Sequence, residues 1–119
     1  MYQRKIPVDK ECGIVIFMEL MGGKWKPWLI NHIHDGEHQP KQLQQGIPLA
    51  AKRVLTKQLG ELEAAGLVYK KVYAEIPMRV EYFLTAVGES VYPIIQEMDK
   101  WGKAHQQLLD HSTVPDATK

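Results

Sequence analysis

Residues 51–85 read AKRVLTKQLGELEAAGLVYKKVYAEIPMRVEYFLT and contain two periodicities in succession. Over residues 51–65 leucines recur at intervals of four and three, which predicts a helix with one buried face. Gly66 can end this helix in the left-handed conformation that favours glycine. Apolar and polar residues alternate over 67–73 and 80–84, which predicts two strands. The six residues between them are too many for a two-residue turn, so a hairpin with a long loop should follow the helix.

The helix face opposite the leucines carries the sharpest concentration of positive charge in the chain. Residues 51–59 include three basic side chains and no acidic one, and the acids Glu61 and Glu63 come behind them. The exposed face consists of Arg53, Thr56, Lys57 and Gly60, with Lys52 at its edge. A net charge of +1 excludes a bulk polyanion binder but allows one basic face of the kind that contacts phosphates. An ordinary solvated helix face is the alternative interpretation.

The residues before this stretch predict three further helices. Residues 12–21 are almost wholly apolar and predict a buried helix that ends at 22–23, a pair of glycines. Residues 24–34 predict a second helix with Pro27 in its first turn, where a missing N–H costs little. A short helix is expected over 40–45.

The residues after the hairpin predict one long helix that begins at Thr85 as its N-cap. Its apolar residues follow steps of four and three over about 22 residues, and Pro93 should kink or divide it. Because a small domain cannot cover so long a stripe, we expect a partner, and a two-fold homodimer is the simplest one. The expected interface residues are Phe17, Val91, Ile94, Met98, Trp101 and Leu108.

The composition fits a single domain with a buried core. The chain has 119 residues, of which 45% are hydrophobic and 24% are charged. Its one cysteine excludes an intrachain disulfide, and no apolar run approaches the ~18 residues of a membrane span. The start of the chain lacks the apolar run of a secretory signal, which predicts a cytoplasmic location. We expect the domain over 12–111, between a flexible arm of 1–11 and a flexible tail of 112–119.

The order of the predicted elements indicates the fold class. A helix-turn-helix followed by a β-hairpin is the order of a winged helix, so we expect an α+β fold. It should be a mostly helical winged helix-turn-helix with a β-hairpin wing and a long C-terminal dimerisation helix. In this arrangement the helix over 51–65 enters the major groove of DNA, and its N-terminal residues meet the base edges.

Three stretches give the chain a resemblance to the HxlR family of bacterial transcriptional regulators, a winged-helix group related to MarR. They are GGKW at 22–25, the leucine- and glutamate-rich segment at 55–68, and the segment at 72–88 with its Arg-Val-Glu-Tyr strand. The resemblance covers about residues 12–102. It implies a homodimer that binds double-stranded DNA at an inverted-repeat operator and represses or activates a nearby gene.

The sequence also departs from the pattern of that family. Ala51 stands where the family commonly has a serine or threonine, and it forgoes a side-chain cap that contributes about 1 kcal/mol. Gly60 stands where a larger, often basic residue is common, and Gly13 replaces a proline found in many relatives. These departures leave open an alternative function, a winged-helix protein-interaction module without DNA binding. A salt titration separates the two, because DNA binding weakens steeply as salt rises.

The charge pattern and the resemblance together name the candidate DNA-binding residues. They are Lys52, Arg53, Thr56, Lys57, Arg79, Lys24 and Lys41. Arg53 is the best candidate for reading guanine, because its planar guanidinium matches two acceptors on that base. The resemblance places the wing around Arg79 along the DNA backbone or in the minor groove. A salt bridge from Arg79 to Glu75 or Glu81 is the alternative.

Cys12 is the candidate for redox sensing. It lies at the predicted N-terminus of the first helix, where the helix dipole favours the thiolate. Some HxlR relatives sense oxidants or electrophiles through a cysteine near this position, which implies an oxidant or small-molecule effector. An inert thiol near the dimer interface is the alternative.

The sequence predicts neither an enzyme nor a cofactor. It contains no glycine-rich phosphate loop, no pair of catalytic carboxylates and no nucleophile–base set. Three histidines lie close together in the sequence, at His32, His34 and His38. A spacing of two residues on a helix points side chains in different directions, so we expect no metal site.

Overall fold

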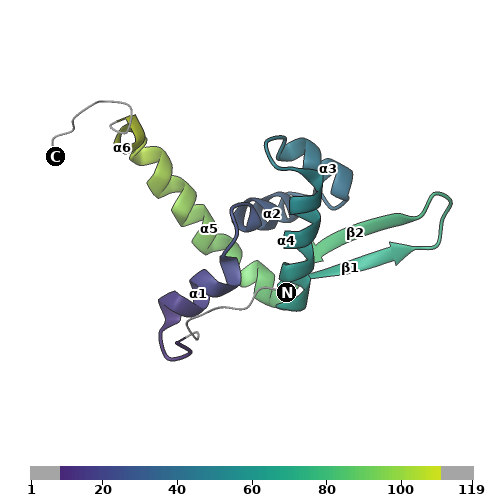
Figure 1. Cartoon of the computed structure of the whole chain (residues 1–119), viewed down its shortest axis with the longest axis horizontal. Helices are drawn as coiled ribbons and strands as arrows, with labels where there is room; N and C mark the ends of the chain where they lie inside the picture. The colour runs from purple at the N-terminus through teal and green to yellow at the C-terminus, as the bar shows by residue number, and fades with distance from the viewer. Residues whose placement is uncertain (1–8, 111–119) are drawn as a thin grey trace.

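The computed structural model describes residues 9–110, and the predicted arm before residue 9 and the tail after residue 111 lie outside them. The helices are α1 (Gly13–Met21), α2 (Lys26–His34), α3 (Pro40–Gly46), α4 (Lys52–Ala64), α5 (Ala86–Ala104) and α6 (Gln107–Asp110). The strands are β1 (Val68–Tyr73) and β2 (Arg79–Leu84). A helix-turn-helix followed by a two-stranded wing and a long helix confirms the predicted α+β winged-helix fold (Figure 1). No helix within residues 9–110 is both long and apolar enough to cross a membrane.

The core lies among α2, α3, α4 and the base of the wing. The largest fully buried side chains are Leu29, Ile30, Ile33, Leu43, Ile47, Leu62, Leu67 and Val68. The predicted leucine face of α4 is confirmed, since Leu55, Leu59 and Leu62 are all buried. Gly66 follows α4 with a φ of 82°, as expected of a helix-ending glycine. These local signals therefore fix where α4 ends and which side of it faces inward.

The wing is an antiparallel hairpin whose register runs from Val68 opposite Leu84 to Tyr73 opposite Arg79. The free edge of β2 is partly covered, because the Tyr82 N–H donates to the His38 carbonyl at 2.8 Å. Tyr82 itself is buried against the core. The base of the wing is thus fixed to the segment before α3, while its far end extends away from the helices (Figure 1).

Helix α5 begins as predicted, with the Thr85 hydroxyl oxygen accepting a hydrogen bond from the Gly88 N–H at 3.0 Å. It continues through Pro93 without a break, so the expectation that this proline divides the helix is wrong. Val91 and Ile95 pack against the core on either side of Pro93, and this packing holds α5 together. The helix ends at Ala104, so the prediction of one helix extending to Leu108 is also wrong. The His105 N–H bonds the carbonyl of Gly102, a residue with low helix propensity, and α6 follows as a separate turn.

Helix α1 is not the buried helix that its composition predicts. Only Met21 of this helix is buried, whereas Ile14 is 76% exposed and Met18 is 63% exposed. Figure 1 shows α1 projecting from the helical body, with α5 extending in another direction. An apolar run predicts that something covers a helix, but within a single copy of this chain most of α1 stays uncovered.

Candidate nucleic-acid interface

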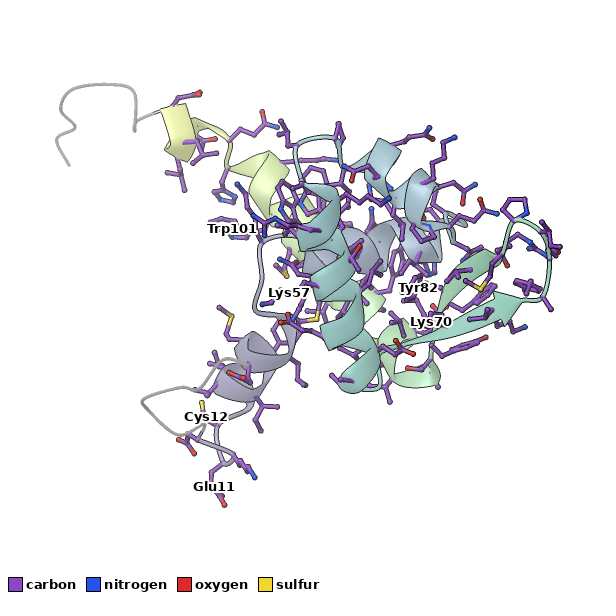
Figure 2. All side chains as sticks on the ribbon, turned by 45° about the vertical axis from the view of Figure 1, so that its right-hand side comes forward. Glu11, Cys12, Lys57, Lys70, Tyr82 and Trp101 are labelled. Carbon is purple, nitrogen blue, oxygen red and sulfur yellow. The ribbon has the colours of Figure 1, made fainter. Side chains whose placement is uncertain are left out.

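The predicted basic face of α4 is exposed. The side chains of Lys52, Arg53, Thr56 and Lys57 all face solvent, while Leu55 and Leu59 between them are buried. Figure 2 shows Lys57 pointing outward from α4. Within residues 9–110 no hydrogen bond or ion pair engages the Arg53 guanidinium, so all of its donors are available to an external acceptor.

The N-terminus of α4 concentrates positive charge. Ala51 occupies the N-cap position in an extended conformation, and no side chain caps the helix. The first turn contains no acid, and it carries Lys52 and Arg53 at the positive end of the helix dipole. Each such cation costs the free helix about 0.3–1 kcal/mol, whereas a phosphate placed there is attracted by the dipole, the free N–H groups and both side chains.

The remaining candidates on α4 have weak partners that an external phosphate can replace. The Thr56 hydroxyl donates to the Lys52 carbonyl at 3.0 Å, which leaves its oxygen free to accept a hydrogen bond. The Lys57 ammonium lies 3.1 Å from a carboxylate oxygen of Glu61, but its side chain is 73% exposed. An exposed ion pair of this kind contributes about 0–1 kcal/mol, so Lys57 can exchange its partner at little cost.

Two contacts that the sequence did not predict fix α4 against α2. The Trp25 N–H donates to the side-chain oxygen of Gln58 at 3.0 Å, across 33 residues of chain. The ammonium of Lys26 lies 3.0 Å from Glu61, with only 8% of the Lys26 side chain exposed. Hydrogen bonds from Lys26 and Lys57 lower the pKa of Glu61 below its ordinary value near 4.5. These contacts join the N-terminus of α2 to the middle of the basic helix and set its orientation.

Replacing Glu61 by glutamine should lower the free energy of unfolding by about 1–3 kcal/mol, because it leaves the buried Lys26 ammonium without a charged partner. Since the Glu61 pKa is depressed in the fold, its contribution is complete at pH 7 and is lost as the pH falls below about 4.5. Urea titrations at pH 7 and at a series of pH values below 4.5 measure both effects. Glu63→Gln is the matched control, because it removes the same charge from an exposed α4 residue. Equal loss in the two variants at pH 7 would contradict this role for Glu61.

Arg79 is engaged inside the wing. Its guanidinium lies 2.9 Å from Glu75 and 2.8 Å from Glu81, and 3.7 Å from the centre of the Tyr73 ring. The hydrogen bond from Arg79 lowers the pKa of Glu75. The salt-bridge alternative that the sequence left open is therefore the one present in the structure. Arg79 is not a free cation, and a phosphate must compete with two carboxylates for it.

Lys24 and Lys41 both lie on the surface. The Lys24 ammonium lies 5.0 Å from the centre of the Trp25 ring, just before α2 begins. Lys41 is in the first turn of α3 and shares a surface hollow with the wing residues 75–80, which are the end of the loop and the start of β2. The structure therefore groups Lys41 with the wing.

The expected dimer residues fall into two groups. Phe17 and Val91 are half-buried and pack against the core of their own chain. The outer residues of α5 and α6 remain exposed, as does most of α1, and we call these exposed apolar residues, taken together, the α1/α5 face. Its members are Ile14, Met18, Ile94, Met98, Trp101 and Leu108. The Trp101 side chain is 61% exposed, which is unusual for so large an apolar side chain.

Cys12 is the N-cap residue of α1 and is a free, half-buried thiol. Figure 2 shows it at the far end of α1, well separated from Lys57 on α4. Any effect of Cys12 on the basic helix must therefore be transmitted through α1 and its contacts.

The three neighbouring histidines serve different partners. His32 lies 2.9 Å from Glu37, His34 lies 3.1 Å from Glu89, and the His38 ring lies 2.7 Å from the Tyr82 carbonyl. Across residues 9–110 no three potential metal ligands come together. The histidines join elements of the fold.

Comparison with known proteins agrees with this architecture. Residues 20–110 match the family described as HxlR-like helix-turn-helix. YybR of Bacillus subtilis, described as an uncharacterized HTH-type transcriptional regulator, is 36% identical over 104 residues, which are 87% of this chain and 83% of YybR.

Solved structures of the redox regulator HypR are also similar. The reduced form has a TM-score of 0.78 at 36% identity and covers 83% of this chain and 98% of HypR. The oxidised form has a TM-score of 0.74 at 38% identity, and the match covers 79% of this chain and 97% of HypR. The chain therefore belongs to the HxlR-like helix-turn-helix family and is a transcriptional regulator rather than an enzyme.

Proposed function

We propose that this regulator binds an inverted-repeat operator as a homodimer, with α4 of each copy in the major groove. The observation that carries the proposal is the exposed, uncapped and basic N-terminal half of α4, in which Arg53 has no partner within residues 9–110. A major groove roughly 12 Å wide admits one α-helix, and the residues near its N-terminus face the bases. Lys52, Thr56 and Lys57 then contact phosphates or a thymine methyl beside the guanine read by Arg53.

The dimer uses the α1/α5 face. Isolated apolar residues are common on protein surfaces, but here six of them lie on α1, on α5 and on α6, which follows α5 directly (Figure 1). A two-fold axis buries the same face of both copies at once. It also presents two α4 helices to half-sites about 34 Å apart along one duplex.

The wing follows the DNA beside each half-site. The Arg79 contacts with Glu75 and Glu81 order the strands that lead into the loop. Lys41 beside the loop adds a cation without an ion pair among the described residues. We assign Arg79 chiefly to the shape of the wing, with a phosphate contact arising when Glu75 releases it.

Cys12 makes the regulator responsive to oxidants or electrophiles. The similarity to HypR, a redox regulator solved in reduced and oxidised forms, supports this assignment. Cys12 begins the helix that supplies part of the α1/α5 face, so a change at its sulfur alters the dimer that positions both α4 helices. In a bacterial cell such a regulator acts in the cytoplasm, where the chromosome lies.

Cys12→Ser should abolish the response to the thiol oxidant diamide and leave operator binding in reducing buffer unchanged. The reason is that Cys12 is the only cysteine of the chain, so a disulfide between two copies can form only between their Cys12 thiols. Operator binding before and after oxidation, together with a non-reducing gel, measures the effect. Met18→Leu removes another oxidisable sulfur on α1 and should keep the response. A response that persists in Cys12→Ser would exclude the thiol as the sensor.

Selection of bound duplexes from a random pool tests the proposal as a whole. We expect enrichment of an inverted repeat whose affinity falls steeply between low and moderate salt. A chain that enriches no motif, and whose weak binding shows no steep salt dependence, would be the protein-interaction module instead.

A further inference from the structure

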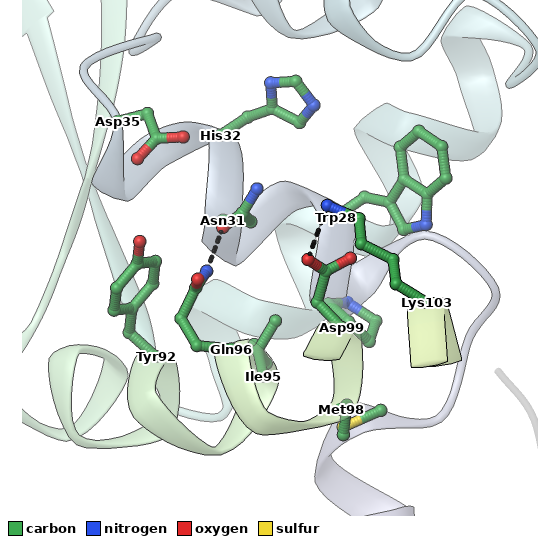
Figure 3. A pocket seen from close by; sticks show the side chains of 11 residues that line it. Trp28, Asn31, His32, Asp35, Tyr92, Ile95, Gln96, Met98, Asp99 and Lys103 are labelled. Atoms are coloured by element: carbon green, nitrogen blue, oxygen red, sulfur yellow. Dashed lines mark hydrogen bonds and ion pairs between the residues drawn. The ribbon is translucent and has the colours of Figure 1, made fainter. Parts of the chain in front are cut away.

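A hollow of about 540 Å³ lies between α2 and α5, and no residue of α4 lines it (Figure 3). This volume is in the range of small-molecule sites, which are typically 300–1,000 Å³. One wall comes from α2 and the α2–α3 connection, and the other comes from α5. The hollow therefore spans the junction between the DNA-reading helices and the helix proposed to join the two copies.

The charges around the hollow favour a cation. Asp35 and Asp99 are two carboxylates in its lining, and Lys103, 3.0 Å from Asp99, is its one ammonium. The Asp35 carboxylate has no partner within residues 9–110, and it lies at the C-terminus of α2, the negative end of the helix dipole. The two carboxylates and one ammonium give the lining a formal charge of −1. His32 also lines the hollow, but its ring is paired with Glu37, which lies outside the lining.

The shape and polarity of the walls favour a flat aromatic ligand. Trp28 is 47% exposed at one side of the hollow, and Tyr92 lies at the other side near Asp35 (Figure 3). Between them the Gln96 amide N–H donates to the Asn31 side-chain oxygen at 2.8 Å, which leaves both N–H groups of the Asn31 amide, the second N–H of Gln96 and the Gln96 oxygen for a ligand. A ring packed on Trp28 would cross this amide pair and bring a basic group to Asp35, beside the Tyr92 ring, which is stacked on His34 with the ring centroids 3.5 Å apart.

We propose that this hollow binds a flat aromatic cation, with Asp35 as the counter-ion, Trp28 as the stacking surface and the Asn31–Gln96 pair as the polar floor. The ligand bridges α2 and α5 without covalent chemistry and is separate from Cys12. Because α2 holds α4 through Gln58 and Glu61, a ligand that changes the packing of α2 on α5 changes the position of the basic helix. This regulatory half rests on the function proposed above, whereas the binding half does not.

Isothermal titration calorimetry on the full chain with three isosteric probes tests the binding half. They are 2-naphthamidine, which is cationic, 2-naphthamide, which is neutral, and 2-naphthoate, which is anionic. We expect the amidine to bind at least about tenfold tighter than the naphthoate, with the amide between them. Asp35→Asn should remove this order, Trp28→Ala should weaken all three probes, and Glu63→Gln should change nothing. Equal affinities in the unmodified chain, or an order that survives in Asp35→Asn, would overturn the proposal.

Operator binding with and without 2-naphthamidine tests the regulatory half. We expect the amidine to change operator affinity in the unmodified chain and not in Asp35→Asn. Binding in the calorimeter with unchanged operator affinity would overturn the coupling between the hollow and α4. A chain that binds the amidine but no duplex would overturn the proposed DNA function and leave the ligand site standing.

Discussion

Arg53→Ala should weaken operator binding by about 1–3 kcal/mol per half-site and remove the preference at one base pair in each half-site. The expectation follows from the position of Arg53 on the exposed face of α4, in the first turn of the helix and with no partner inside the described residues. Fluorescence anisotropy with the selected duplex and its single-base variants measures both effects. The fold should be unaffected, since no contact of the core includes the Arg53 side chain.

Lys57→Ala is the matched comparison for Arg53→Ala. The flexible ammonium of Lys57 suits a phosphate, so its loss should weaken binding to all duplex sequences evenly. The slope of log affinity against log salt concentration should fall by about 1 for each copy of the chain. Its ion pair with Glu61 is exposed, so stability should change by less than about 1 kcal/mol. If Arg53→Ala enriches the same motif as the unmodified chain, the assignment of this helix face to base reading is wrong.

Trp101→Glu should convert the dimer into a monomer and lower operator affinity by about 10²–10⁴-fold. Trp101 is 61% exposed on the α1/α5 face, and burying a carboxylate there against a second apolar surface is unfavourable. The affinity falls because a joined pair binds its second half-site at a high effective concentration, which a monomer lacks. Size-exclusion chromatography with light scattering gives the mass, and anisotropy gives the affinity.

Leu49→Glu is the control for the mass measurement. Leu49 is still more exposed, at 85%, but it lies between α3 and α4 rather than on the α1/α5 face. The same charge at Leu49 should leave the dimer intact. A Trp101→Glu chain that keeps the mass of a dimer would move the interface elsewhere.

The fold followed from signals that act over a few residues. The leucine spacing in α4, the left-handed Gly66 and the Thr85 cap each depend on neighbours within one or two turns of helix, and all three are confirmed. The basic face was predictable for the same reason, because the exposed side of α4 is defined by the leucines on its other side.

The contacts that orient α4 join residues far apart in the chain, and the sequence did not predict them. Nothing local indicates that Gln58 accepts from the Trp25 N–H, or that the partner of Lys26 is Glu61. For Arg79 the sequence supplied the salt-bridge partners but not the choice between them and DNA. For α1 it supplied an apolar composition, which is the same for a helix covered by its own chain and one covered by a second copy.

Operator affinity as a function of half-site spacing tests whether a dimer places two α4 helices on one duplex, because helices fixed in one dimer can reach only half-sites in helical phase. With the selected inverted repeat, we expect maximal affinity at a centre-to-centre spacing of about one helical turn, 10–10.5 base pairs. We also expect a large loss of affinity when about five base pairs, half a turn, are inserted. Affinity that does not depend on spacing, or stable binding of one copy to a single half-site, would contradict it.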